Sequence, residues 1–344
     1  MKNNKDKVLV TGSSGYIALH CIKELLNSGY RVKGSLRTIQ RETEVRKSLN
    51  VDIEKANLEF CKLDLLENEG WDEAVSDCDY LIHIASPFYL EEPKNENDLI
   101  KPALEGTLRA LRASKNSNIK KIVITSSMAS IAYGHKKNIC FTTDWTDINK
   151  EVGAYIKSKT ISEKAAWDFF YDELKDSLKM TTIHPGMVFG PLLNKDIEGA
   201  SASLISKMIM GKLPALPDVY FTVVDVRDVA KLHVQALKNI SSDNKRIIVT
   251  SKNGVPLLEV SRILRELGYS KSPNKLIPNQ VIKSLSPFNK SMKSTASMIN
   301  RGCYGTDISE TFSIFDWEPI SLFKSLEDMT KSLEEIIGEN KLNQ

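Results

Sequence analysis

The first two thirds of the chain alternate short apolar segments with longer amphipathic stretches. An apolar segment of strand length followed by a helical stretch, repeated several times, is typical of a parallel β-sheet covered by helices. The expected strands are residues 7–11, 30–35, 58–63, 80–84, 121–125 and 180–183.

The helix expected after the first of these strands is the most clearly marked. Ile17, Cys21 and Leu25 recur at every fourth position and define one apolar face, and Gly29 follows as a stop signal. Residues 103–114 place leucines on one face in the same way, which predicts a second covering helix.

The pattern changes near Gly186, where prolines become frequent and loops are expected. After Leu257 the chain is mostly helical in character, and it ends in an amphipathic run over residues 322–337. Two segments between these points, 221–225 and 246–250, have the apolar character of further strands.

These patterns predict an α/β fold, a Rossmann-type doubly wound parallel sheet with a smaller C-terminal lobe. Residues 1–185 are assigned to the Rossmann-type domain, and residues 221–250 are expected to rejoin it. Residues 186–220 and 251–344 are assigned to the lobe. A chain of 344 residues has room for this arrangement, because it exceeds the size at which single cores usually stop growing.

Composition and charge narrow the classes of function. The chain is 41% hydrophobic and 26% charged, which is ordinary for a globular protein, and its formal net charge is only +3. Basic residues are mixed with acidic ones, so we expect no nucleic-acid partner and no membrane partner. No apolar segment has the length of a transmembrane helix or of a secretory signal, and a cytoplasmic location is expected.

The cysteines and histidines show neither a Cys-x-x-Cys pair nor the spacing of a zinc site, so no metal is predicted. Several cysteines fall in apolar periodic segments, where a thiol packs as a small apolar group in a reducing compartment. The residues concerned are Cys21, Cys61, Cys78, Cys140, Cys303, His20, His83, His135, His184 and His233.

A glycine-containing loop joins the first strand to the first helix. Its spacing is Gly12-x-x-Gly15-x-x-Ala18, a variant of the dinucleotide-binding fingerprint Gly-x-Gly-x-x-Gly. Glycines let the backbone turn sharply beside a pyrophosphate, and the helix N-terminus offers it free N–H groups. An ordinary strand-to-helix turn can look similar, but the position at the first strand–helix junction favours nucleotide binding.

The end of the second strand indicates which dinucleotide is bound. An acidic residue there would hold a ribose hydroxyl of NAD, whereas this chain has Arg37, followed by Arg41. A guanidinium binds a 2′-phosphate through paired hydrogen bonds, so the predicted cofactor is NADPH/NADP. Asp64, after the third strand, is a candidate for bonding the adenine amino group, and a turn or helix-capping role is nearly as well supported.

Two further segments contain candidate catalytic side chains. Ser127 follows the expected strand 121–125 at its carboxyl end, where open parallel sheets bind ligands. Tyr155 and Lys159 stand one helical turn apart at the start of an expected long helix, and they therefore share a face.

This set of side chains suits the reduction of a carbonyl group. A nicotinamide supplies hydride, and the protein has to supply a proton to the oxygen that develops negative charge. A free tyrosine has a pKa of about 10, and the Lys159 ammonium is expected to lower the pKa of Tyr155 toward neutrality. Ser127 is expected to donate a hydrogen bond to the substrate oxygen. A Tyr-x-x-x-Lys pair alone is a common accident in helices, but here it accompanies the glycine loop and the serine-rich strand end.

Several longer motifs strengthen this interpretation. They are Val-Thr-Gly-Ser-Ser-Gly-Tyr-Ile-Ala (10–18), Ala-Ser-Pro-Phe (85–88), Glu-Gly-Thr-Leu-Arg-Ala-Leu (105–111), Thr-Ser-Ser (125–127), Tyr-Ile-Lys-Ser-Lys (155–159), His-Pro-Gly-Met-Val-Phe-Gly-Pro (184–191) and Val-Asp-Val-Arg-Asp-Val-Ala (224–230). With them the chain resembles, over most of its length, the extended short-chain dehydrogenase/reductase superfamily. Within that superfamily it resembles the dihydroflavonol reductase-like and NADPH-dependent aldehyde/ketone reductase group.

The resemblance implies NADPH-dependent reduction of an aldehyde or ketone, with the C-terminal lobe binding the substrate. It implies that Tyr155 is the acid/base, that Ser127 orients the substrate and that Lys159 bonds the nicotinamide ribose while tuning the tyrosine. It also implies Arg37 on the 2′-phosphate and Asp64 near adenine. The full set of expected cofactor-binding residues is Gly12, Ser14, Gly15, Tyr16, Ile17, Arg37, Asp64, Leu65, Ala85, Ser86, Thr125, Tyr155, Lys159, Pro185 and Val188.

Two departures limit what the resemblance implies. Plant dihydroflavonol reductases have an asparagine shortly after Thr-Ser-Ser that bonds the flavonoid, whereas this chain has Ala132, so a flavonoid substrate is not predicted. Many superfamily members have a relay asparagine in the helix before the catalytic strand. This chain has Glu105 in that neighbourhood, and the relay is not assigned.

Two other functions stay open at this point. A nucleotide-sugar epimerase or dehydratase of the same superfamily would usually keep NAD bound and have an acid near the position of Arg37. A non-catalytic NADP-sensing regulator would bind the dinucleotide without turnover, although such proteins tend to lose the tyrosine or the lysine. The expected partner is a small-molecule carbonyl substrate, and the expected assembly is a monomer or a homodimer.

Overall fold

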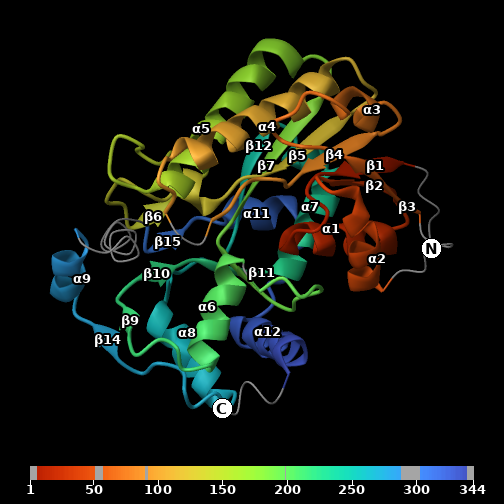
Figure 1. The fold of residues 1–344 in the computed structure, drawn as a ribbon. Coiled ribbons are helices and arrows are strands. Elements are labelled where there is room, and N and C mark those ends of the chain that lie inside the picture. The colour runs from red at the N-terminus through yellow and green to blue at the C-terminus, as the bar shows by residue number, and fades with distance from the viewer. Residues whose placement is uncertain (1–5, 51–56, 90–91, 198, 288–302, 339–344) are drawn as a thin grey trace.

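The computed structural model describes residues 6–50, 57–89, 92–197, 199–287 and 303–338. A seven-stranded parallel sheet with helices on both faces lies above a smaller, mainly helical lobe in Figure 1. The strand order is β12-β7-β5-β4-β1-β2-β3. The strands of this sheet are β1 Lys7–Val10, β2 Arg31–Leu36, β3 Leu58–Lys62, β4 Tyr80–His83, β5 Lys121–Thr125, β7 Lys179–Pro185 and β12 Lys245–Val249.

The predicted fold class is confirmed, and its doubly wound topology fixes where a ligand can bind. From β1 the chain moves outward to β2 and β3, and it then returns to place β4 on the other side of β1. Val8 of β1 accordingly pairs with Val32 of β2 on one side and with Tyr80 of β4 on the other. The crevice at the carboxyl ends of β1 and β4 is therefore the topological switch point at which such sheets bind ligands.

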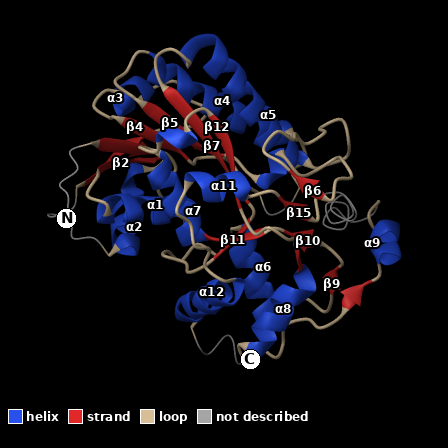
Figure 2. Cartoon of the chain, turned by 180° about the vertical axis from the view of Figure 1, so that it is seen from behind, coloured by secondary structure: helices blue, strands red, loops and turns tan. Residues whose placement is uncertain are grey.

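Alternate side chains of the strands enter two cores, one on each face of the sheet. Val8 and Val10 belong to one core and Leu9 to the other, and all three are fully buried. A strand buried on both faces reads as a continuous apolar run, which is why these strands were predictable. One face is covered by α1 Tyr16–Asn27, α2 Glu42–Leu49 and α7 Val226–Ala236, and the other by α3 Trp71–Val75, α4 Asn97–Lys115 and α5 Ala154–Phe169 (Figure 1 and Figure 2).

The lobe has a core of its own, in which Phe189, Ile205, Leu264 and Met329 are fully buried. Its described helices are α6 Ala200–Ile209, α8 Leu257–Glu266, α9 Asn279–Leu285 and α12 Leu322–Ile337. Its short strands, which pair two by two, include β9 Leu216–Pro217, β10 Tyr220–Phe221, β13 Val255–Pro256 and β14 Leu276–Ile277.

The expectation of loops after Gly186 is wrong for two segments. Residues Met187–Phe189 form β8, and residues Ala200–Ile209 form α6. Helix α6 contains alanines and serines between its buried apolar residues. These small side chains weaken the apolar periodicity on which the sequence-based prediction depends.

The two segments expected to be further strands take different places. Strand β12 pairs with β7 at the edge of the main sheet, with Ile247 opposite Ile183. Strand β11 Val223–Asp225 instead pairs with β8 in a separate two-stranded sheet. The division of the chain into domains stays a prediction.

Gly186 stands where the chain leaves β7 for the lobe. A Cβ at this position would lie 2.2 Å from both the carbonyl oxygen of Thr222 and Oγ1 of Thr250. No larger residue fits there without displacing backbone, so glycine permits the connection to pass between neighbouring segments.

Two cysteines whose positions along the chain suggest no pairing lie next to each other. Cys140 in β6 Ile139–Cys140 and Cys303 are joined as a disulfide, with their Cα atoms 5.7 Å apart. The segment after Cys303 forms β15 Gly305–Thr306, which pairs in parallel with β6, and α11 Ser309–Ile314 follows. The sequence analysis did not predict this pairing. Across the described ranges, no helix has both the length and the apolar character needed to cross a bilayer.

Candidate active site

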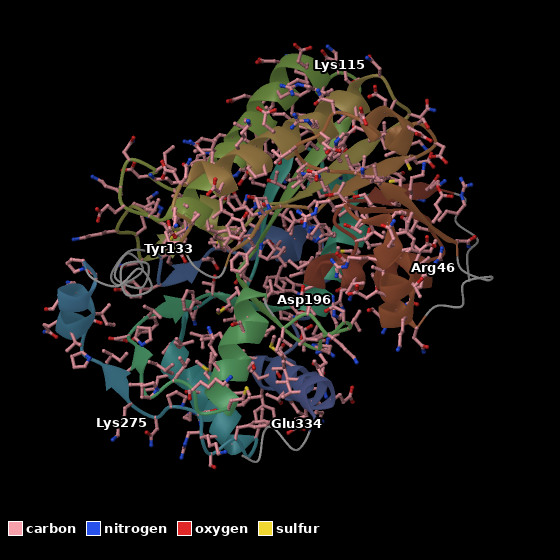
Figure 3. The ribbon with its side chains drawn as sticks, in the orientation of Figure 1. Arg46, Lys115, Tyr133, Asp196, Lys275 and Glu334 are labelled. Atoms are coloured by element: carbon pink, nitrogen blue, oxygen red, sulfur yellow. A yellow bond between two sulfur atoms is a disulfide. The ribbon has the colours of Figure 1, made fainter. Side chains whose placement is uncertain are left out.

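A cavity of about 1410 Å³ opens at the carboxyl ends of the sheet strands, between the sheet and the lobe. It is lined by every residue that the sequence analysis assigned to catalysis or cofactor binding, from Gly12 to Val188. Tyr133 and Asp196, which also line it, lie between the two halves of the molecule in Figure 3, whereas Lys275 and Glu334 lie within the lobe. The topology thus gathers residues from distant parts of the chain around one space.

The loop between β1 and α1 forms a cradle for an anion. Gly12 has φ +72°, and a Cβ there would lie only 3.1 Å from Ala85, so this position needs glycine. Gly15 is the N-cap of α1, no side chain caps that end, and the first turn contains no acidic residue. The free N–H groups of the first turn face the cavity together with the positive end of the helix dipole. These residues fit the pyrophosphate of a dinucleotide.

Two arginines lie at the end of the cavity beyond β2, and their surroundings differ. Arg41 donates hydrogen bonds to Oγ of Ser14 over 3.1 Å and to the Glu44 carboxylate over 2.9 Å. Arg37 is exposed and makes no side-chain hydrogen bond or ion pair with any described residue. Arg37 is therefore free to bind an anion at this edge, whereas the charge of Arg41 is already balanced by Glu44.

The position of Asp64 agrees with both roles considered from the sequence. The carboxylate lines the cavity near the loop, and its Oδ1 accepts a hydrogen bond from the backbone N–H of Leu66 over 2.8 Å. This contact closes a turn after β3. Leu65 lines the same wall and packs against Gly106 of α4, where a Cβ would approach the leucine side chain to 2.4 Å.

Ser127, Tyr155 and Lys159 meet at the opposite end of the cavity from Arg37. Ser127 begins a short helical turn after β5, and its Oγ accepts a hydrogen bond from the N–H of Ala129 over 3.1 Å. The Ser127 hydroxyl lies near the phenol of Tyr155, which is in the first turn of α5, and it favours the ionised form of that phenol. One turn later, Nζ of Lys159 donates to the carbonyl oxygen of Thr125 over 3.3 Å.

The electrostatics of this group differ from the sequence-based expectation. Burial raises the pKa of Tyr155, and the nearby Ser127 hydroxyl only partly opposes that shift. Burial also lowers the pKa of Lys159 to about 8, against the effect of the nearby Glu163 carboxylate. The predicted lowering of the Tyr155 pKa is therefore wrong for this structure. The cost of burying a phenolate dominates, and the Lys159 ammonium bonds a backbone carbonyl rather than the phenol.

A buried carboxylate one turn after Lys159 connects the catalytic helix to the sheet. Glu163 accepts hydrogen bonds from His184 over 2.8 Å and Arg246 over 2.7 Å at Oε1, and from Ser126 and Ser130 over 2.5 Å at Oε2. Burial alone would raise the pKa of Glu163, but His184 and Arg246 hold it well below its ordinary value. These bonds fix α5 to the ends of β5, β7 and β12.

The sequence analysis did not identify Glu163. The signal available was its spacing, because Tyr155, Lys159 and Glu163 follow one another at intervals of four on one helix. An acidic residue on the buried face of a helix indicates a buried partner.

The N-terminus of α5 is held by the segment after β4. Oε1 of Glu92 accepts a hydrogen bond from the N–H of Ala154 over 2.6 Å, and it places a negative charge at the positive end of the helix. Phe88 packs edge-to-face against Tyr155, with ring centroids 5.5 Å apart. This segment therefore covers the tyrosine and contributes to its burial.

The part of the cavity beyond Tyr155 is largely aromatic and apolar. Ala132, the position at which the sequence analysis noted a missing asparagine, also lines this part. Such a lining suits an apolar carbonyl compound rather than a highly hydroxylated one. The residues of this wall include Phe88, Met128, Ala132, Tyr133, Met187, Tyr220, Phe221 and Tyr304.

Two residues that the sequence analysis set aside lie outside the cavity lining. His83 is buried, and its Nδ1 hydrogen-bonds Oγ1 of Thr11 over 3.0 Å. Burial lowers the pKa of His83 to about 3, so the ring stays neutral. Glu105 forms an ion pair with Arg109 over 3.4 Å on α4.

The chain is similar to known proteins over most of its length. The model of the NAD dependent epimerase/dehydratase family matches residues 8–250. Cinnamoyl-CoA reductase CAD2 of Medicago truncatula is 37% identical over 268 residues, which covers 76% of this chain and 80% of that protein. The Candida albicans Gre2 structure with NADPH has a TM-score of 0.79 at 27% identity, covering 96% of this chain and 99% of that chain. The yeast methylglyoxal/isovaleraldehyde reductase Gre2 with NADPH has a TM-score of 0.80 at 23% identity with the same coverage, a likeness of fold.

The contacts of Glu163 predict that Glu163→Gln is strongly destabilising. The amide keeps the size of the side chain but leaves Arg246 buried without its counter-charge, so the free energy of unfolding should fall by about 2–4 kcal/mol. Urea denaturation measures this change. The control is Glu173→Gln, which removes an exposed ion pair with Lys115 and should change the stability by less than about 0.5 kcal/mol. Equal stability of the two variants would contradict the assignment.

Proposed function

Because this chain belongs to the NAD dependent epimerase/dehydratase family, we propose that it is a reductase that converts an aldehyde or ketone to the alcohol with NADPH. Its reductase relatives bear out the resemblance inferred from its motifs. One observation carries the proposal: Ser127, Tyr155 and Lys159 line the same cavity as the glycine loop.

The residues around the cavity suggest how the dinucleotide is held. The unpaired N–H groups of the first turn of α1 would hold the pyrophosphate, and Arg37 would hold the 2′-phosphate that distinguishes NADP from NAD. Lys159 would bond the nicotinamide ribose, and the backbone from Pro185 to Val188, which lines the same cavity, would form the wall beside the nicotinamide. When bound, the cofactor supplies the hydride.

Tyr155 supplies the proton. A raised pKa keeps the phenol protonated at neutral pH, and the substrate oxygen becomes a strong base as it gains negative charge. Ser127 donates a hydrogen bond that holds this oxygen beside the phenol. The Lys159 ammonium stabilises the phenolate that remains after proton transfer.

Tyr155→Phe should abolish reduction while leaving the cofactor site intact. Loss of the acid is expected to lower kcat by at least about 10²-fold, with the Kd for NADPH changed by less than about twofold. NADPH consumption with a panel of aldehydes, α-keto carbonyls and aryl ketones measures the first quantity, and fluorescence titration measures the second.

The control for this prediction is Tyr171→Phe, on an exposed tyrosine at the end of the same helical segment. This variant should turn over like the unchanged protein. Turnover retained by Tyr155→Phe would refute the acid assignment. If the unchanged protein binds NADPH but reduces no compound of the panel, a sensor role is favoured, and NAD retained through purification would favour an epimerase.

The pH dependence should report the protonation of Lys159. The value of kcat/KM for NADPH reflects groups of the free enzyme, and it should stay constant in acid solution and fall as the pH rises through about 8, where Lys159 loses its charge. In Glu163→Gln the fall should begin at lower pH, because the carboxylate helps to keep the lysine protonated. A profile that is flat through this range would refute the role of Lys159.

The cofactor preference should depend on Arg37. Arg37→Glu replaces the anion-binding guanidinium with a carboxylate, and it should lower the preference for NADPH over NADH by about 10- to 100-fold. The matched control is Arg41→Gln, since Arg41 is already paired with Glu44, and its effect should be less than about threefold. Ratios of kcat/KM for the two cofactors decide between these outcomes. An unchanged preference in Arg37→Glu would exclude this arginine from the 2′-phosphate site.

A further inference from the structure

The Cys140–Cys303 pair joins distant parts of the chain beside the cavity. The two residues are separated by 163 positions, and their Cα distance of 5.7 Å lies in the usual range for a disulfide. Strands β6 and β15 hold this spacing, because Thr306 pairs with Cys140 in their ladder. The bond thus links the loop after Ser127 to the segment that enters the final part of the lobe.

The two cysteines differ from the other three in surroundings. Burial raises the pKa of Cys61 to about 11 and that of Cys78 to about 12, and it raises the pKa of Cys21 strongly. Such thiols are poor nucleophiles. Cys303 is half-buried and lines the open cavity, where small molecules reach it, whereas Cys140 lies behind it and is buried.

A histidine completes the group. The ligand atoms of His135, Cys140 and Cys303 all lie within 4.8 Å of one another. Nε2 of His135 hydrogen-bonds the carbonyl oxygen of Ile131 over 2.8 Å, which leaves Nδ1 as the proton acceptor of the ring. This Nδ1 is buried and has no hydrogen-bond partner among the described residues. It is available to take a proton from a neighbouring thiol.

We propose that Cys140 and Cys303 form a reversible thiol–disulfide exchange site that reacts with small-molecule disulfides and thiols at the substrate end of the cavity. In the oxidising direction the Cys303 thiolate attacks one sulfur of a small-molecule disulfide, forms a mixed disulfide and releases a first thiolate. The Cys140 thiolate then attacks Cys303, forms the internal disulfide and releases a second thiolate.

Atoms and electrons balance in this exchange. The protein pair loses two electrons, and the small-molecule disulfide gains them as it becomes two thiols. The proton of Cys303 passes to a released thiolate, and the proton of Cys140 passes through His135 to the other. The reverse sequence, begun by a small-molecule thiol, restores the two cysteines.

The bond fixes part of the wall that faces the substrate. Tyr304 follows Cys303, lines the cavity and packs against Tyr220, with ring centroids 5.7 Å apart. On the other side, Sγ of Cys303 lies 3.9 Å from the carbonyl oxygen of Ala132, another cavity residue. Oxidation therefore adds a covalent tie between Tyr304 and the loop after Ser127 to the pairing of β6 and β15, and reduction leaves that pairing as the remaining connection.

A metal site is the competing use of these three side chains. Structural zinc sites have four protein ligands, and within the described part of the chain only His135, Cys140 and Cys303 gather here. The Cα spacing and the missing fourth ligand favour the disulfide.

Thiol counting on the purified full-length protein tests the exchange without using its activity. After equilibration with glutathione disulfide and denaturation, alkylation should find three free thiols, and after dithiothreitol it should find five. Peptide mapping should identify the Cys140–Cys303 link. Five free thiols after oxidation, or a link between other cysteines, would overturn the proposal. The proposal would also be overturned if the reduced protein bound stoichiometric zinc and the Cys303→Ser variant did not.

The melting temperature and the kinetic constants test whether the disulfide orders the wall of the cavity. Oxidation should raise the Tm by about 3–8 °C, because the bond closes a long loop. It should also lower the KM for the carbonyl substrate about three- to tenfold by ordering Tyr304, with the KM for NADPH unchanged. The effect on the carbonyl KM rests on the proposed function, whereas the thiol count and the Tm do not.

Cysteine variants distinguish the effect of the Cys140–Cys303 disulfide from the effect of oxidation elsewhere in the protein. Cys140→Ser and Cys303→Ser should each show the same Tm and KM in oxidised and reduced buffer. The control Cys61→Ser alters a half-buried cysteine outside the cavity, and it should keep the full response. A response that survives in Cys303→Ser would overturn the proposal.

Discussion

A carboxylate removed from water stays ionised only where cations and hydrogen-bond donors surround it, and Glu163 meets this condition at the centre of the molecule. Its partners come from β7, from β12 and from the turn that follows β5, while Glu163 itself belongs to the helix of Tyr155 and Lys159. A network whose members are all needed to balance one charge tolerates little displacement. The position of α5, and hence the place of the Tyr155 phenol beside the cavity, follows from this requirement.

The parts of the fold that could be predicted from the sequence are those whose structure is determined by residues close together in the chain. Central strands such as β1 and β5 are buried on both faces, so their apolar runs identify them. The glycine loop and the spacing of Tyr155 and Lys159 are equally local signals. The parts that were missed depend on contacts made across the fold. Helix α6 has too few large apolar residues to show its period, and the two paired cysteines are far apart in sequence.

The pKa of Tyr155 shows why residue types alone do not determine electrostatics. From spacing, a lysine one turn away suggests a lowered pKa for the phenol. In the structure, that lysine bonds the carbonyl oxygen of Thr125, while Phe88 and the wall of the cavity remove the phenol from water. Desolvation and charge act in opposite directions on a phenolate, and only the three-dimensional arrangement decides which is larger. The lobe likewise contributes Tyr220, Phe221 and Tyr304 to the aromatic wall, and none of the quoted motifs contains these residues.

The place of β12 at the edge of the sheet also bears on how the protein is made. Arg246 lies 83 residues after Glu163, so a ribosome has synthesised the whole catalytic helix well before it reaches the arginine that balances its buried acid. Until β12 docks beside β7, burial of Glu163 lacks a principal counter-charge, and the helix has reason to remain partly solvated. The nascent chain therefore contains Tyr155, Lys159 and Glu163 long before it can hold them in the arrangement of the folded protein. Emergence of β12 from the ribosome, rather than translation of α5, then sets the moment at which this helix can dock fully.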